Sequence, residues 1–216
     1  MEFLGPDAWQ AVALSLKVAF WATLAALPFG LGTAYLLARG RFPGRSLLNG
    51  LVHLPLILPP VVTGYVLLLV LPRTLVFTWW AGVLASAIVG MPLFVQLARA
   101  GFESVDPELI EAARVDGASR WDVARRVIAP LSSAAITAGA VLHFARALGE
   151  FGATLVVAGN LPGRTQTVPL ALFSRLQQVG GEAASVRLAV VAVALAAVSL
   201  GASRLLLRRW GRGAAP

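Results

Sequence analysis

Two charged side chains, Arg146 and Glu150, lie in an otherwise apolar stretch of the chain. Charges inside a membrane-spanning segment are costly, so they are normally paired or take part in moving ions or protons. Side chains four residues apart share one face of a helix and can neutralise each other. Two interpretations are therefore open: a self-neutralising pair buried between helices, or a pair of which one member lines or gates a pathway.

Hydroxyl and amide side chains follow this pair along the chain. Such donors could pass an anion along a pathway without trapping it, and ordinary hydrogen bonding within a loop is the competing interpretation for each of them. The candidate pathway residues are Thr154, Asn160, Thr165, Gln166 and Thr167. Arg73 and Arg164 could draw an anion in from outside.

Motifs for covalent chemistry are absent from the sequence. The phosphate-binding pattern GxxxxGK[ST] does not occur, so ATP hydrolysis by that route is excluded. There is no cysteine, which excludes a disulfide framework and a thiolate metal site. His53 and His143 lie in different apolar stretches without a carboxylate at metal-ligand spacing, which favours hydrogen bonding in the core. We expect no catalytic residue, no metal and no cofactor bound by this chain.

The composition is that of a membrane protein. Of the 216 residues, 58% are hydrophobic and 13% are charged, about half the charged fraction of a soluble domain. Apolar segments long enough for roughly 30 Å of hydrocarbon predict an all-α, polytopic chain, 1–216, forming one transmembrane domain. The five predicted spans are 18–38, 47–71, 76–98, 133–158 and 186–207. Segment 7–17 is expected to begin as an interfacial helix. Segment 168–179 is expected to form a short amphipathic or re-entrant helix.

The distribution of arginine predicts the orientation of these spans. Twelve of the 18 basic residues fall in or beside the loops after spans one, three and five. Cytoplasmic loops carry an excess of basic residues, so we expect the N-terminus outside and the C-terminus inside. The twelve are Arg39, Arg41, Arg45, Arg99, Arg114, Arg120, Arg125, Arg126, Arg204, Arg208, Arg209 and Arg212. The net charge of +8 thus reflects membrane topology, and no nucleic-acid partner is expected.

The long polar segment 106–131 predicts two short helices outside the bilayer. Asp106 before Pro107 is typical of a helix start, and Gly117 can adopt the left-handed turn that ends a helix. Ser119 is expected to cap the second helix, with Asp122 as its capping-box partner. In that helix one predicted face is apolar, formed by Trp121, Ala124, Ile128 and Leu131. Arg120, Arg125 and Arg126 lie largely off it.

The same segment resembles the EAA loop of bacterial ABC importer permeases. Glu111-Ala112-Ala113 is followed by three residues, Gly117, nine residues, Val127 and then Ala129-Pro130. Val127 and Ala129 stand where the family pattern has Ile and Leu. The resemblance implies a type I ABC importer permease fold whose cytoplasmic coupling helix docks in a cleft of an ATPase subunit. The coupling residues it implies are Glu111, Ala112, Ala113, Gly117, Ala118 and Arg120.

Two longer runs resemble the molybdate permease subunits within this family. One is Leu54 to Tyr65, LPLILPPVVTGY; the other is RALGEFGAT from Arg146 and AGNLPGRTQT from Ala158. Membership implies a homodimer, two cytoplasmic ATPase subunits that bind ATP and Mg, and a periplasmic or lipid-anchored oxyanion-binding protein. It also implies a location in the bacterial or archaeal cytoplasmic (inner) membrane and ATP-driven import of molybdate or tungstate.

Three alternatives are kept. Sulfate/thiosulfate permeases share a related GEFG segment, so tetrahedral dianions as a class are the safer expectation. An ATP-independent channel or carrier would need an ion-coupling carboxylate, and Glu150 is the one candidate. A membrane scaffold or assembly factor would need neither ATP coupling nor an oxyanion.

Overall fold

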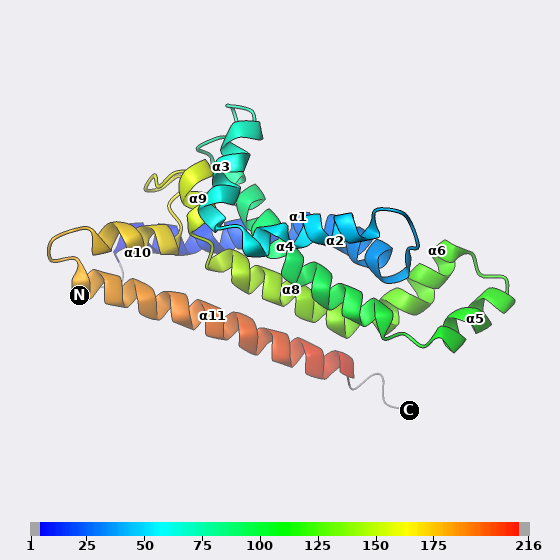
Figure 1. Cartoon of the computed structure of the whole chain (residues 1–216). Coiled ribbons are helices and arrows are strands. Elements are labelled where there is room, and N and C mark those ends of the chain that lie inside the picture. The colour runs from blue at the N-terminus through cyan, green and yellow to red at the C-terminus, as the bar shows by residue number, and fades with distance from the viewer. Residues whose placement is uncertain (1–4, 212–216) are drawn as a thin grey trace.

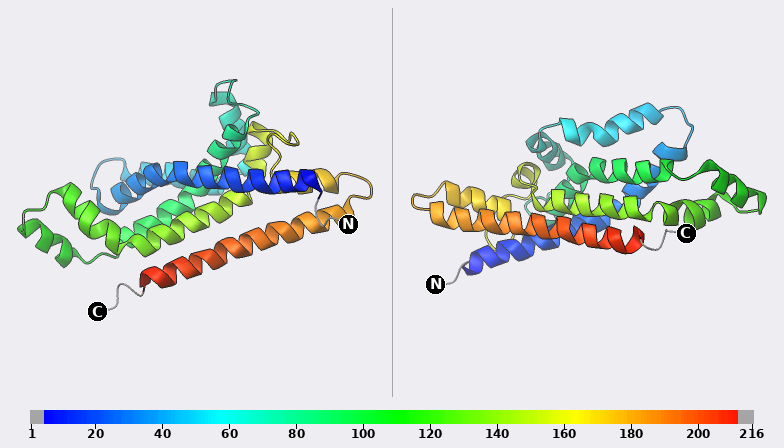
Figure 2. Two further views of the ribbon diagram at one scale, coloured as in Figure 1. Left: turned by 180° about the vertical axis from the view of Figure 1, so that it is seen from behind. Right: turned by 90° about the horizontal axis from the view of Figure 1, so that it is seen from below.

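The computed structural model describes residues 5–211, with side chains through residue 199. Within that part of the chain the regular structure is helical, without strands. The body is built from four long helices that run alongside one another (Figures 1 and 2): α1 (Pro6–Arg39), α4 (Trp79–Glu103), α8 (Ser133–Leu148) and α11 (Glu182–Gly211). Helix α4 packs against α1 and α8, and α11 covers α8.

Helix α1 is one continuous helix of 34 residues, so the separate interfacial helix expected at 7–17 is not found. At 1.5 Å per residue it is about 50 Å long, well beyond the roughly 30 Å of a bilayer core. About one-third of the way along its length, α1 contacts α4 where the Lys17 ammonium lies 3.8 Å from the centre of the Trp79 ring. Trp79 in turn stacks on Trp80. Aromatic and basic anchors of this kind are typical of the membrane interface.

The stretch 47–71, expected as one irregular span, forms two helices. These are α2 (Arg45–Ile57) and α3 (Pro60–Val70), which meet at an angle of 113°. Leu58 and Pro59 between them are extended, the conformation that a following proline imposes. Pro59 and Pro60 also lack the N–H groups that would continue α2. The pair is therefore a broken span or a re-entrant loop rather than a single straight helix.

The stretch 133–158 is also interrupted. Helix α8 ends at Leu148, and a short helix, α9 (Gly152–Val157), follows after a break of three residues. Helices α3 and α9 pack against each other and project from the side of the four long helices (Figure 1). Close approach depends on glycine: a Cβ at Gly64 would lie 2.6 Å from the carbonyl oxygen of Ala153, and one at Gly152 would lie 3.1 Å from Pro60 Cβ.

The remaining helices lie at the two ends of the body. Helix α10 (Val168–Leu176) packs on α1 and α11 through the cluster that contains Val12, Ala171 and Leu188. At the opposite end is the polar segment, made of α5 (Pro107–Val115), α6 (Arg120–Val123), the π-helical turn η1 (Ala124–Ile128) and α7 (Ala129–Leu131). Figure 1 shows the end of α1, the end of α4, this polar segment and the end of α11 at the same end of the molecule.

This arrangement brings the segments after the first and third predicted spans together with the end of α11, as the arginine distribution predicted. Which side of the membrane this end faces stays a prediction. Arg212 lies outside the described residues, and so do the side chains of Arg204, Arg208 and Arg209.

One apolar cluster joins the polar segment to the body. Leu37 of α1 and Phe94 and Phe102 of α4 are buried in it together with Ile110 of α5 and Val123 and Ile128 from the second half of the segment. Burying each such side chain contributes about 1.5–3 kcal/mol. The polar segment is therefore packed onto the ends of α1 and α4 rather than hanging from two flexible linkers.

Candidate functional site

We call residues 106–131 the coupling segment, after the role that their EAA-like spacing predicts. Its first half ends in a Schellman motif: Gly117 has a φ of +85°, its N–H donates to Arg114 O, and the Ala118 N–H donates to Ala113 O. Those two bonds satisfy carbonyls that the end of a helix leaves without partners. At the start of α5, the Asp106 side chain accepts from the Glu108 N–H at 2.9 Å. The helix boundaries expected here are confirmed.

The second half begins at the predicted cap. The Asp122 N–H donates to Ser119 Oγ at 3.1 Å, and the Ser119 hydroxyl donates to the Asp122 carboxylate. That hydroxyl, and then the Arg126 guanidinium nearby, hold the pKa of the Asp122 carboxyl below its usual value. The carboxylate is therefore in its charged, capping form throughout the physiological pH range.

The apolar face predicted for this second helix is only partly correct, because Ile128 is buried and Ala124 is partly buried but the other two residues are not. Trp121 and Leu131 are exposed, whereas Val123 and Ile128, five residues apart, are buried in the cluster with α4. The π-helical turn at Ala124–Ile128 is the cause, because an i to i+5 repeat brings 123 and 128 onto one face. A widened turn is expected before Pro130, whose ring clashes with the carbonyl four residues back in a regular helix.

The predicted coupling residues divide into two groups. Ala113 and Ala118 are partly buried against the apolar cluster, so their small side chains allow the two halves to pack on the body. The exposed group consists of Glu111, Ala112, Gly117 and Arg120. Two large apolar side chains are exposed beside them, Val115 at 88% and Trp121 at 72%. Exposed apolar side chains in an otherwise polar segment are typical of a docking surface.

Arg146 and Glu150 form the expected ion pair, with 2.8 Å between Arg146 Nη1 and Glu150 Oε2. They are not on one helix, however, since α8 ends at Leu148 and Glu150 lies in the break before α9. Oε1 of Glu150 accepts from the Ala153 N–H at 2.9 Å, which satisfies an N–H at the start of α9. The Glu150 side chain is almost fully buried, while that of Arg146 is about one-third exposed. The pair thus fastens the end of one helix to the start of the next.

The structure places the candidate pathway residues in local hydrogen-bond networks. Thr154 donates to backbone carbonyls one turn earlier. The Asn160 amide donates to Ser174 Oγ at 2.8 Å, and the Gln166 amide donates to Asn160 Oδ1 at 2.8 Å, which ties the loop after α9 to α10. Thr165 Oγ1 donates to Gly159 O and accepts from the Leu161 N–H. Loop stabilisation therefore accounts for most of their hydrogen bonds.

Three hydroxyl groups are different. The hydroxyls of Thr63, Ser86 and Thr167 are buried and have no hydrogen-bond partner within the described part of the chain. A buried hydroxyl without a partner costs roughly 1–3 kcal/mol, so each has hydrogen-bonding capacity that a water molecule or a ligand group would satisfy. Thr167 was a candidate from the sequence. Thr63 and Ser86 were missed, because a single hydroxyl inside an apolar helix gives no periodic signal.

His143 has the hydrogen-bonding core role predicted for it. Its ring is fully buried, with Nδ1 3.1 Å from Thr23 Oγ1 and Nε2 3.2 Å from the Ala87 carbonyl oxygen. The ring lies directly over Gly90, where a Cβ would be 2.7 Å from the imidazole. His143 therefore links α8 to α1 and α4 at the centre of the body.

Sequence comparison decides the family. Residues 26–212 match the family of binding-protein-dependent transport system inner membrane components. The chain belongs to this family. It is accordingly a permease, a transport subunit that crosses the cytoplasmic (inner) membrane several times.

Curated relatives cover nearly the full length of the chain. The molybdenum transport system permease protein ModB of Escherichia coli K12 is 46% identical over 93% of both chains. ModB of Haemophilus influenzae is 43% identical over the same share of both chains. The sulfate transport system permease protein CysT of Escherichia coli K12 is 37% identical, covering 94% of this chain and 75% of its own.

Solved structures confirm the fold. The MetNI methionine ABC transporter in an inward-facing conformation superposes with a TM-score of 0.72 over 94% of both chains, at 15% identity. A bacterial ABC transporter that imports alginate gives a TM-score of 0.76, with 96% of this chain and 81% of the other covered, at 18% identity. The type I ABC importer permease fold implied by the EAA-like spacing is therefore correct.

Proposed function

We propose that this permease carries molybdate or tungstate into the cell as the membrane subunit of an ATP-driven importer. The observation that supports this best is the 46% identity with a molybdenum permease over nearly the whole chain, against 37% with a sulfate permease. A tetrahedral dianion cannot cross hydrocarbon, so it requires a lined pathway. Uptake in a strain without its own molybdate permease tests the proposal: molybdate and tungstate should compete with each other, and sulfate in excess should not.

Sulfate import is the second candidate, because a sulfate permease is also more than one-third identical. The same uptake experiment separates the two. Sulfate that competes as strongly as tungstate would transfer the proposal to sulfate, and uptake of neither anion would refute both.

The proposed energy source is a pair of cytoplasmic ATPase subunits, which bind ATP and Mg and dock on the coupling segment. This is supported by the exposed Val115 and Trp121 beside Glu111, and by the apolar cluster that packs the segment onto α4. The chain would then be inserted with its N-terminus outside and its C-terminus inside. Replacing Ala112, which is exposed, with cysteine gives a labelling site: a membrane-impermeant thiol reagent should react from the cytoplasmic side, and reaction from outside would refute the orientation.

A second copy of this chain and an external oxyanion-binding protein complete the proposed importer. The two helices at the 113° bend, α2 and α3, leave many apolar side chains exposed, with Leu51 at 57%, Ile57 at 80% and Leu69 at 67%. A homodimer could bury part of this surface around a shared pathway. Cross-linking of a cysteine introduced at Leu69 between two copies would support that arrangement, and a monomer in nanodiscs with full transport activity would refute it.

The ion pair at the break between α8 and α9 is proposed as part of the gate. Glu150 is bonded to both Arg146 and the α9 N-terminus, so rotation of α9 relative to α8 must break one of these contacts. A carboxylate engaged in this way is poorly suited to exchange ions with water, which weighs against the ATP-independent carrier.

A further inference from the structure

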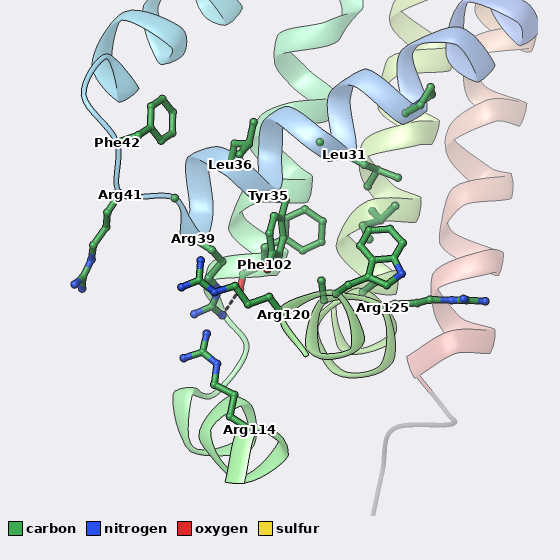
Figure 3. Close-up of a pocket in the computed structure, with 17 residues that line it drawn as sticks. Leu31, Tyr35, Leu36, Arg39, Arg41, Phe42, Phe102, Arg114, Arg120 and Arg125 are labelled. Carbon is green, nitrogen blue, oxygen red and sulfur yellow. Dashed lines mark hydrogen bonds between the residues drawn. The ribbon is translucent and has the colours of Figure 1, made fainter. Parts of the chain in front are cut away.

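A cavity of about 1250 Å³ lies between the last turns of α1 and the second half of the coupling segment (Figure 3). Its walls are partly apolar, with Leu31 and Tyr35 from α1, Phe102 from the end of α4, and Trp121 from α6. Five arginines line it: Arg39, Arg41, Arg114, Arg120 and Arg125. No aspartate or glutamate is among the lining residues of this described region.

Three of the five arginines direct their guanidinium groups to one end of the cavity. Figure 3 shows Arg39, Arg114 and Arg120 pointing toward one another there, while Arg41 and Arg125 point away. The three come from separate elements, namely the end of α1, α5, and the start of α6. Guanidinium groups stay charged at any physiological pH, so their mutual repulsion cannot be relieved by loss of a proton.

Within residues 5–199, no acidic side chain forms an ion pair with any of these three arginines. The ion pairs found in the described part of the chain involve other arginines: Arg45, Arg99, Arg126 and Arg146. Arg39 is held in place, since its Nη2 donates to the carbonyls of Phe102 and Val105 at 2.6 and 3.1 Å. Its Nε is buried and has no partner in the described structure. A fixed cation with an unused donor beside two more guanidinium groups is a preorganised anion site.

We propose that this cavity binds one tetrahedral oxyanion group, held by Arg39, Arg114 and Arg120. The group could be supplied by a free oxyanion or by the phosphate headgroup of an anionic lipid, and the chemistry of recognition is the same. Bound there, it would connect α1 to both halves of the coupling segment and so reduce the freedom of that segment to move. The site is a brace on the coupling segment and does not depend on which anion the importer carries.

The experiment uses the full chain reconstituted with its ATPase subunits in nanodiscs. One arm compares nanodiscs of phosphatidylcholine with and without phosphatidylglycerol; the other adds sodium phosphate to pure phosphatidylcholine nanodiscs, with sodium chloride at equal ionic strength as reference. Hydrogen exchange of residues 107–131 reports bracing, and native mass spectrometry reports bound lipid. The test variant is Arg114→Gln with Arg120→Gln. The matched control is Arg175→Gln with Arg187→Gln, which removes the same charge from exposed or partly exposed positions elsewhere.

We expect phosphate or phosphatidylglycerol to slow exchange in the coupling segment of the wild type and of the control. The test variant should need at least about tenfold more of the anion for the same protection, since tenfold corresponds to about 1.4 kcal/mol, slightly less than one hydrogen bond to a charged group contributes. A response in one arm alone identifies the source of the oxyanion. Equal responses of the test and control variants would overturn the proposal. The absence of a response in both arms would overturn it as well, and is the result expected if carboxylates of the ATPase fill the cavity.

This outcome is independent of transport specificity. A chain that transports sulfate in place of molybdate would leave the brace intact, and loss of the brace would leave the uptake competition between molybdate, tungstate and sulfate unchanged in order.

Discussion

Replacing Gly117 tests whether the turn between the two halves of the coupling segment sets the position of its docking face. The φ of +85° is the left-handed conformation, and a Cβ built here would meet no atom within 4 Å. The cost of alanine is therefore conformational and not steric, about 1–2 kcal/mol. That amount shifts the balance between the formed and the opened turn by roughly 5- to 30-fold. Asparagine tolerates this conformation better than alanine, and proline is locked at negative φ.

We therefore expect coupled transport to fall in the order Gly117, then asparagine, then alanine, then proline. The loss for alanine should be at most the roughly 5- to 30-fold shift in the turn equilibrium, with asparagine between alanine and the wild type. The assay measures molybdate taken up per ATP hydrolysed in proteoliposomes that contain the ATPase and the binding protein. Size-exclusion chromatography confirms that each variant is folded. An alanine variant with wild-type coupling, or an asparagine variant weaker than alanine, would refute the reasoning.

Three further predictions concern the ion pair, the glycine contact and the cap. Glu150→Gln should slow transport and destabilise the protein by about 2 kcal/mol, because a partly buried arginine loses its partner; thermal unfolding in detergent measures it. Gly64→Ala should destabilise by about 1–3 kcal/mol or more, since its Cβ would lie 2.6 Å from the backbone oxygen of Ala153. Ser119→Ala should raise the pKa of Asp122, whose largest pKa-lowering contact is the Ser119 hydroxyl, as measured by carboxyl NMR titration.

The sign of the pH effect at the cap follows from the lowered pKa of Asp122. A carboxyl with a lower pKa in the folded state contributes stability above its unfolded pKa and loses that contribution as pH falls through its folded pKa. Hydrogen exchange of the α6 amides should therefore become faster only at acid pH. In Ser119→Ala the same increase should begin at a higher pH than in the wild type.

Gly50→Ala is the control for the Gly64→Ala prediction. A Cβ at Gly50 meets nothing within 4 Å, so alanine there should be neutral or slightly stabilising. A Gly64→Ala protein as stable as Gly50→Ala would contradict the packing argument.

The coupling segment was predictable because its boundaries depend on interactions within a few residues. Asp106 caps the helix that starts at Pro107, Gly117 ends it, and Ser119 caps the next, as the local sequence indicated. Its π-helical turn was not predictable in the same way. Pro130 disfavours a regular helix at this point, but a regular repeat would pair Trp121 with Ile128, and it is the packing of Val123 in the cluster with α4 that shows which residues the wider turn buries.

The breaks within the second and fourth predicted spans had only partial signals. Pro59 and Pro60 mark the bend between α2 and α3, but hydropathy alone joins the two helices. The break after Leu148 is stabilised by contacts between elements far apart in the sequence, including Gly152 against Pro60. The sequence indicated that Asn160 could donate hydrogen bonds, but not to which residue. Its partner, Ser174, is set by the packing of the loop after α9 against α10. The pathway roles of these side chains stay predictions.

Helix α8 connects the two sites that the proposed transport cycle must link. It begins next to the coupling segment, after a bend of 71°, and its last turns carry Arg146, which holds Glu150 at the start of α9. Its 16 residues make a rod of about 24 Å. The start of α8, next to the coupling segment, is fixed to α4. Ser132 Oγ donates to the Gly101 carbonyl at 2.8 Å, and a Cβ at Gly101 would lie 2.5 Å from the Cβ of Ala135.

Two motions would carry a displacement of the coupling segment through this helix to the ion pair. Either α8 and α4 move together as one packed unit, or the bend at Ser132 opens and the contact with Gly101 is lost. The contact of His143 with Ala87 and Gly90 opposes sliding of α8 along α4 as well, because the buried ring fits over a residue without a side chain. Packed helices of this kind resist continuous deformation. Movement of α8 and α4 as a unit is therefore the motion that the structure favours, with the strain taken up where the helices are already broken, at residues 149–151 and at Leu58 and Pro59.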